Sequence, residues 1–183
     1  MIVLSGASAS GKTEVAKVLA KKYGITKVIT TTTRSMREGE TNGKDYFFIS
    51  KEEFLEKIKN KEFVEYVTYN DNYYGSTKDQ VAADKCIVTE PNGLKSYIKL
   101  KRQNKNIITF FLESDEATRY ERMLLRGDGK KKAIERIKGD RIAFSKENIP
   151  HVDFHIESEE SSVEEVADTI YNKYQEKLNK IKK

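Results

Sequence analysis

Residues 6–13 read Gly6-Ala7-Ser8-Ala9-Ser10-Gly11-Lys12-Thr13, which matches the phosphate-binding pattern G-x-x-x-x-G-K-[S/T] in full. A short apolar run, residues 1–4, precedes the motif, and apolar residues at helical spacing follow it over residues 11–23. A Gly/Ser-rich turn can match such a pattern by chance, but a strand before it and a helix after it are the context that the motif requires. The sequence therefore predicts a P-loop, in which backbone N–H groups and a helix N-terminus surround a phosphate.

The motif also predicts the phosphate donor and a metal cofactor. Residues 6–13 as a whole are expected to bind ATP, with Lys12 reaching the β- and γ-phosphates. The hydroxyl of Thr13 is expected to help hold Mg²⁺ between those phosphates. The motif thus indicates which molecule donates the phosphate but not which molecule accepts it.

Outside the motif, short β-branched runs alternate with longer helical patterns, which favours an α/β fold with a largely parallel core sheet flanked by helices. Residues 34–75 differ, because clustered Tyr and Phe surround two expected strands, 44–49 and 63–69, and a short helix, 51–60. We interpret them as an inserted lobe. The expected core strands are residues 1–4, 28–32, 85–89, 106–112 and 153–156, and the expected core helices are residues 11–23, 92–101, 115–126, 131–145 and 163–181.

These elements predict one domain over residues 1–183, with a core (1–33, 76–121 and 142–183), a lobe (34–75) and a short basic lid (122–141). Charged residues make up 34% of the chain and no aliphatic run could span a bilayer, so we expect a cytoplasmic protein without membrane contact. Its net charge of +5 suits a polyanionic ligand but also a solvated surface. The single cysteine, Cys86, lies in an apolar run and is expected to be buried rather than reactive.

The inserted lobe carries a resemblance to a known family. Its run Thr30-Thr31-Thr32-Thr33-Arg34-Ser35-Met36-Arg37-Glu38-Gly39-Glu40-Thr41-Asn42-Gly43-Lys44-Asp45-Tyr46-Phe47-Phe48 resembles the signature of guanylate kinases, which are P-loop nucleoside monophosphate kinases. The runs Glu62-Phe63-Val64-Glu65-Tyr66 and Asn72-Tyr73-Tyr74-Gly75-Ser76-Thr77 continue it, and together these matches cover about a quarter of the chain. The resemblance implies a P-loop NTPase fold with a lobe that binds the nucleoside monophosphate.

The resemblance also implies roles for individual residues of the lobe. Arg34 and Arg37 would bind the phosphate of GMP, with hydroxyl donors from Tyr46 and Tyr74. Glu65 would accept hydrogen bonds from guanine N1–H and N2–H₂, a pair of donors that adenine lacks. For each tyrosine alone, core packing is an equally good interpretation. The full set of residues implied to bind GMP is Thr30, Arg34, Arg37, Tyr46, Glu65, Tyr74, Ser76 and Glu90.

One stretch departs from the family pattern. Where guanylate kinases carry an Asp-x-Asp segment, this chain reads Val88-Thr89-Glu90-Pro91-Asn92-Gly93, so Glu90 is the one remaining acid. Lid arginines follow the family more closely: Arg122, Arg126 and Arg136 resemble those that neutralise the transferring phosphate, and Arg141 is a further candidate. Each of these arginines alone would also suit a solvated helix face.

The resemblance implies ATP-dependent phosphorylation of GMP, and of dGMP, by a monomer or homodimer. Two other interpretations remain at this point. The same scaffold serves kinases of other nucleotides or phosphorylated small molecules, and guanylate-kinase-like modules without catalysis bind peptides. A third function, nucleic-acid binding through the basic surface, is disfavoured because the chain lacks an aromatic nucleic-acid-binding motif.

Overall fold

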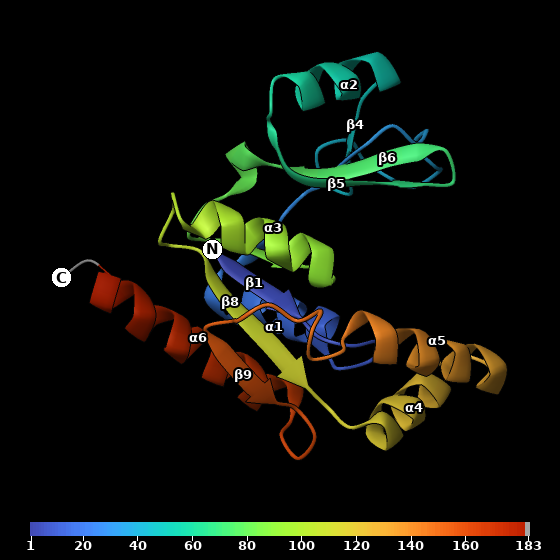
Figure 1. The fold of residues 1–183 in the computed structure, drawn as a ribbon, viewed down its shortest axis with the longest axis vertical. Coiled ribbons are helices and arrows are strands. Elements are labelled where there is room, and N and C mark those ends of the chain that lie inside the picture. Colours follow the sequence, from blue (N-terminus) through green and yellow to red (C-terminus); the bar gives the residue numbers. More distant parts are fainter. Residues whose placement is uncertain (182–183) are drawn as a thin grey trace.

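The computed structural model describes residues 1–181, which form two β-sheets and six α-helices (Figure 1). The larger sheet has five strands in the order β2-β7-β1-β8-β9, and every pairing in it is parallel. Its strands are β1 (Ile2–Ser5), β2 (Thr26–Lys27), β7 (Lys85–Val88), β8 (Ile108–Glu113) and β9 (Phe154–Glu157). The expected α/β fold with a parallel core sheet is confirmed.

Helices cover both faces of this core sheet, which agrees with the burial of every residue of β1. Ile2 and Leu4 pack against α1 (Lys12–Tyr23) and α6 (Val163–Ile181), whereas Val3 packs against α3 (Pro91–Lys101) on the other face. In Figure 1, α3 lies between the core sheet and the smaller sheet. The core therefore fixes the start of α1, where the phosphate-binding motif lies, and the face of α3 that meets the lobe.

The smaller sheet has four strands in the order β4-β3-β6-β5, and a helix covers it (Figure 1). Its elements are β3 (Thr31–Thr32), β4 (Phe47–Phe48), β5 (Phe63–Tyr69), β6 (Asn72–Thr77) and α2 (Lys51–Lys59). The antiparallel pair β5–β6 is joined by a tight turn at Asn70 and Asp71, both of which have positive φ. The α2 helix begins with a capping box, in which Ser50 and Glu53 exchange hydrogen bonds with each other's backbone amides.

Two strand predictions were wrong in extent. Of the expected strand 28–32, only Thr31–Thr32 forms a strand, β3, which pairs with β4 and β6 in the lobe. The core strand β2, which pairs with β7, lies earlier, at Thr26–Lys27, so the chain crosses between the two sheets within the expected strand. A run of β-branched residues suits either sheet, so its composition gives no sign of the crossing. The expected strand 44–49 shortens to β4, because the amides of Lys44 and Asp45 donate to the carbonyl of Thr41 in a turn.

The remaining helices are α4 (Glu116–Leu125) and α5 (Lys130–Ala143), which pack side by side beyond the carboxyl ends of the core strands (Figure 1). Cys86 is fully buried in β7, as expected, and burial raises the pKa of its thiol to about 12. The lysine-rich end of the chain forms part of α6, whose Tyr174 and Leu178 are buried, and its last two residues, 182–183, lie outside the described residues. Within residues 1–181 no helix is both long and apolar enough to cross a membrane.

Candidate active site

The phosphate-binding loop follows β1 directly and ends in the first turn of α1. Gly6 has a φ of 149°, and a Cβ atom there would lie 2.5 Å from the carbonyl oxygen of Leu112, so only glycine fits. The Nζ atom of Lys12 turns back to donate to the carbonyl oxygens of Gly6 (2.6 Å) and Ala7 (2.7 Å). The first N–H groups of α1 have no partner within the helix, which leaves them available to an anion.

Lys12 is held where its charge is disfavoured. Burial lowers the pKa of Lys12 to about 8; Asp140 and Glu90 oppose this shift, whereas Arg119 and Arg126 reinforce it. Asp140 and Arg119 were not predicted as site residues. Within residues 1–181, the ammonium group of Lys12 has carbonyl partners but no direct anionic one. A bound phosphate would supply that anion.

A cavity of about 470 Å³ opens beside the loop. Arg122 and Arg126 line it, as predicted for lid arginines, and the guanidinium of Arg122 also donates to the carbonyl oxygen of Ser158 at 2.5 Å. The hydroxyl of Ser158 donates to the carbonyl of Ser10, which ties the end of β9 to the phosphate-binding loop. The cavity is lined by Ala9, Ser10, Gly11, Lys12, Thr13, Glu14, Val15, Arg122, Arg126, Ser158, Ser161, Val163 and Val166.

The other two lid arginines lie elsewhere. Arg136 is exposed on α5 and does not line this cavity, although its charge contributes to the low pKa of Asp128, whose main cause is a hydrogen bond from Arg126. Arg141 pairs with Glu116 of α4 through two hydrogen bonds, of 2.8 and 2.6 Å. The structure thus brings two of the four arginines to the cavity.

In the lobe, three of the predicted phosphate-binding residues lie together. The Arg34 guanidinium lies 5.6 Å from the ring centroid of Tyr46, and the rings of Tyr46 and Tyr74 meet edge to face at 6.1 Å. Glu40 pairs with Arg34 at 2.7 Å and also accepts from the backbone N–H of Arg37. The Arg37 side chain itself is exposed. Glu40 therefore pairs with the guanidinium group that a phosphate would also bind.

Glu65 and Ser76 lie side by side on the paired strands β5 and β6. The Ser76 hydroxyl donates to Glu65 Oε1 at 2.7 Å, and it accepts from the hydroxyl of Tyr97 on α3 at 2.9 Å. Burial raises the pKa of the half-buried Glu65 carboxyl, an effect that its hydrogen bonds with Ser76 oppose. Tyr97, which is fully buried, was not predicted as part of the site. Its place in an apolar helical pattern marks it as a core residue, and nothing in the sequence singles out its hydroxyl.

The last predicted residues are Thr30, Glu90 and Thr13. Thr30 lies where the chain crosses into the lobe, and its carbonyl accepts from Phe47. Glu90 is the exposed N-cap residue of α3, and its charge acts on Lys12. Within residues 1–181 no three metal-binding side chains cluster. Thr13 lines the cavity beside the phosphate-binding loop, and a threonine hydroxyl there can serve as a protein ligand to a Mg²⁺ ion that also binds nucleotide phosphates and water.

Comparisons with known proteins agree with this geometry. A family model described as guanylate kinase matches residues 1–179. A guanylate kinase of Anaplasma phagocytophilum is 32% identical over 182 residues, 94% of this chain and 84% of the relative. The crystal structure of a guanylate kinase from the same organism superposes with a TM-score of 0.55 and 26% identity, covering 96% of this chain and 84% of that one.

Another relative matches over a shorter segment. A guanylate kinase of Fusobacterium nucleatum is 47% identical over 81 residues. That segment is 44% of this chain and 44% of the relative, so the match spans less than half of the relative's length.

Proposed function

This chain belongs to the guanylate kinase family, and we propose that it transfers the γ-phosphoryl group of ATP to GMP, forming ADP and GDP. The observation that carries the proposal is the pair formed by Glu65 and Ser76. Glu65 Oε1 accepts from the Ser76 hydroxyl, and within residues 1–181 no other side chain donates to this carboxylate, which can therefore also accept from a ligand. Guanine offers N1–H and N2–H₂ donors to such an acceptor, whereas adenine presents an acceptor at N1 and would leave the carboxylate unpaired.

The phosphate of GMP would bind at the arginine and tyrosine group of the same lobe. Arg34 would exchange Glu40 for the phosphate, since both are anions that suit a forked guanidinium. Hydroxyl groups of Tyr46 and Tyr74 and the exposed side chain of Arg37 would complete the phosphate site. Thr30, where the chain enters the lobe, and Glu90, at the start of α3, would contact the nucleoside.

ATP would bind in the cavity beside the phosphate-binding loop. Backbone amides of residues 6–13 would surround its phosphates, and Lys12 would exchange its carbonyl partners for β- and γ-phosphate oxygens. Thr13 would contribute a hydroxyl to Mg²⁺, which supplies positive charge to the phosphates when bound. Arg122 and Arg126 would neutralise the transferring group from α4, and Arg136 would join them from α5.

The reaction makes modest chemical demands on these side chains. A phosphate oxygen of GMP is already ionised at neutral pH, so no general base is needed to activate it. The residues must align the attacking oxygen with the leaving ADP and exclude water. We propose that the lobe (34–75) and the lid (122–141) close onto the core (1–33, 76–121 and 142–183) when both substrates bind, in the cytoplasm.

The test is a coupled assay of ADP release with ATP and Mg²⁺, in which GMP, dGMP, AMP, CMP, UMP and dTMP are offered in turn. We expect turnover with GMP and dGMP alone, and loss of this turnover in Lys12→Ala. Turnover with another acceptor would replace GMP by that nucleotide. ATP binding without any turnover would instead favour a binding module that has lost catalysis.

A further inference from the structure

A buried ion pair lies against the phosphate-binding loop, and the proposed function does not use it. Arg119 of α4 and Asp140 of α5 meet at 2.7 Å, with side-chain exposures of only 6% and 11%. Both belong to the helices that carry the lid arginines. A buried pair of this kind is often no more stabilising than well-packed apolar residues of similar volume, so stability alone is a weak reason for it.

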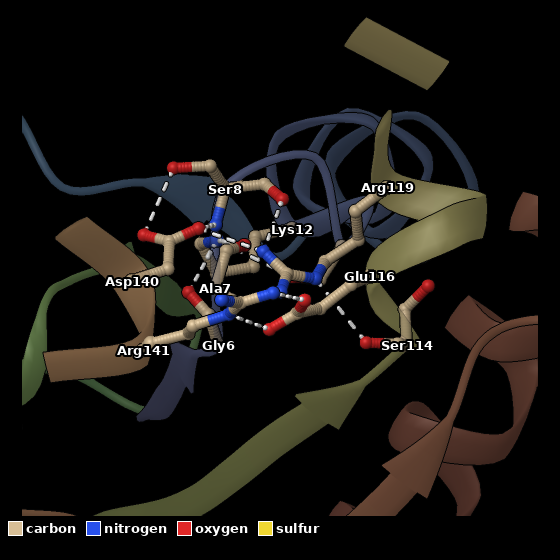
Figure 2. A network of polar contacts seen from close by, with 10 residues as sticks. Gly6, Ala7, Ser8, Lys12, Ser114, Glu116, Arg119, Asp140 and Arg141 are labelled. Atoms are coloured by element: carbon tan, nitrogen blue, oxygen red, sulfur yellow. Dashed lines mark hydrogen bonds and ion pairs between the residues drawn. The ribbon is translucent and has the colours of Figure 1, made fainter. Parts of the chain in front are cut away.

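The pair binds the backbone of one residue of the loop, Ser8 (Figure 2). Asp140 Oδ2 accepts from the Ser8 backbone N–H at 2.8 Å, and Oδ1 accepts from the Ser8 hydroxyl at 3.2 Å. Arg119 makes a longer contact, 3.4 Å, with the Ser8 carbonyl oxygen, and its Nε donates to the carbonyl of Ser114. Both polar groups of the Ser8 backbone thus have a charged partner, and the two partners come from different helices.

The position of Asp140 on its helix connects this contact to catalysis. Arg136 precedes Asp140 by four residues, so the two side chains lie on one face of α5, one turn apart. Fixing Asp140 against Ser8 therefore fixes how far Arg136 lies from the loop. Ser8 also follows Ala7, whose carbonyl oxygen accepts a hydrogen bond from Lys12 Nζ.

We propose that Arg119 and Asp140 are positioning residues that hold the phosphate-binding loop at Ser8 and set the place of α5, with Arg136, relative to it. This inference rests on the proposed phosphoryl transfer. The pair joins the lid helices to the loop before any substrate binds. When the lid closes onto the core, this contact would keep α5 in a fixed register with the loop.

The experiment separates positioning from stability by comparing a variant expected to lower kcat but not the melting temperature with one expected to lower the melting temperature but not kcat. Arg119→Met/Asp140→Leu removes both charges and keeps the volume, so the melting temperature should stay within a few degrees while kcat falls about 10- to 100-fold with KM for GMP unchanged. Asp140→Asn leaves Arg119 unpaired, so its melting temperature should fall. Its amide oxygen still accepts from the Ser8 N–H, so kcat should stay within about threefold of the wild type.

Glu116→Gln is the matched control, because Glu116 joins the same two helices through Arg141 without touching Ser8. We expect it to change neither kcat nor the melting temperature. A double variant with the kcat of the wild type would overturn the proposal, and so would a kcat that follows the melting temperature across the series. If the double variant does not fold, Asp140→Ser replaces it: it destabilises as Asp140→Asn does but is too short to reach Ser8, so equal kcat in these two would also overturn the proposal.

A second readout keeps this test independent of the acceptor. Affinity for a fluorescent ATP analogue should fall about tenfold in Arg119→Met/Asp140→Leu and stay unchanged in Asp140→Asn. If the wild type phosphorylates no nucleotide, the proposed function fails, and the same affinity comparison still decides whether the pair positions the loop. Equal affinities in both variants would then overturn the inference.

Discussion

Replacing Glu65 with glutamine should abolish most of the preference for guanine while leaving the fold intact. The change keeps one acceptor oxygen, which can continue to accept from Ser76 at the observed 2.7 Å. It converts the other oxygen into an NH₂ donor. That donor would face the N1–H and N2–H₂ donors of guanine, so hydrogen bonds are lost and two donors are opposed.

The magnitude follows from the number and type of bonds lost. A hydrogen bond to a charged group contributes about 1.5–3 kcal/mol, and two such bonds to guanine would be lost or reversed. A loss of about 3–6 kcal/mol corresponds to a fall of at least about 100-fold in kcat/KM for GMP. Affinity for ATP should not change, because the ATP cavity is lined by other residues.

The pH dependence of folding stability gives a second, independent prediction for the same variant. Burial raises the pKa of Glu65 above its value in the unfolded chain, so the folded state binds the proton more tightly. The favourable contribution of Glu65 is therefore present at low pH and is lost as pH rises through the raised pKa. Glutamine does not ionise, so Glu65→Gln should be at least as stable as the wild type at pH 7, and this relative gain should shrink toward pH 4.

The assay is the coupled measurement of ADP release across GMP concentrations, with melting temperatures recorded at pH 7 and pH 4 without nucleotide. Ser76→Ala is a useful companion variant, because it removes a neutral hydroxyl and should reduce kcat/KM for GMP by only about tenfold. If Glu65→Gln changed kcat/KM for GMP by less than about threefold, Glu65 would not be the group that recognises guanine. The argument from the Glu65–Ser76 pair would then be refuted.

Three further predictions use the same physical reasoning. Because burial lowers the pKa of Lys12 to about 8, the side chain loses its charge above that pH, and kcat/KM for ATP should fall above about pH 8. Lys12→Met should lose about 100-fold or more of kcat, and its kcat/KM for ATP should not fall near pH 8. Tyr97→Phe removes a buried hydroxyl that donates to Ser76 at 2.9 Å, so denaturant unfolding should show a loss of about 1 kcal/mol and KM for GMP should rise about fivefold. Cys86, fully buried and with its thiol pKa raised to about 12, should react with a thiol reagent only after unfolding, and labelling of the native protein within minutes would contradict this placement.

The core could be predicted from the sequence because its signals are local and agree with one another. The motif at residues 6–13 requires a strand before it and a helix after it, and β1 and α1 are found there. Strand β5 and helix α6 have the predicted bounds, and Ser50 and Ser162, each followed three residues later by a glutamate, cap the starts of α2 and α6 with hydrogen bonds to that glutamate. In each case residues close in sequence determine the structure, so distant contacts were not needed for the prediction.

Predictions that depended on distant partners fared worse. The expected strand 28–32 contains the crossing from the core sheet to the lobe, because β2 pairs with β7 and β3 pairs with β6, partners more than 40 residues away. Arg119 and Asp140 have the helical spacing of core positions, yet charged residues at such positions are usually assigned to a solvated face. Only the fold brings them to Ser8, 111 and 132 residues away.

Two ionisable groups of the proposed substrate sites, Lys12 and Glu65, have pKa shifts that disfavour the charged form, whereas paired groups on the surface have shifts that favour it. Asp168 and Glu62 have lowered pKa values because Lys22 and Lys57, respectively, donate to them. Burial instead moves the pKa of Lys12 down and that of Glu65 up, so that in each case the charged form is disfavoured. Phosphate oxygens and guanine N–H groups are the partners that would favour those charged forms. Burial disfavours the charged forms of Lys12 and Glu65. A substrate group that pairs with either charge therefore gains more binding free energy there than it would at an exposed site.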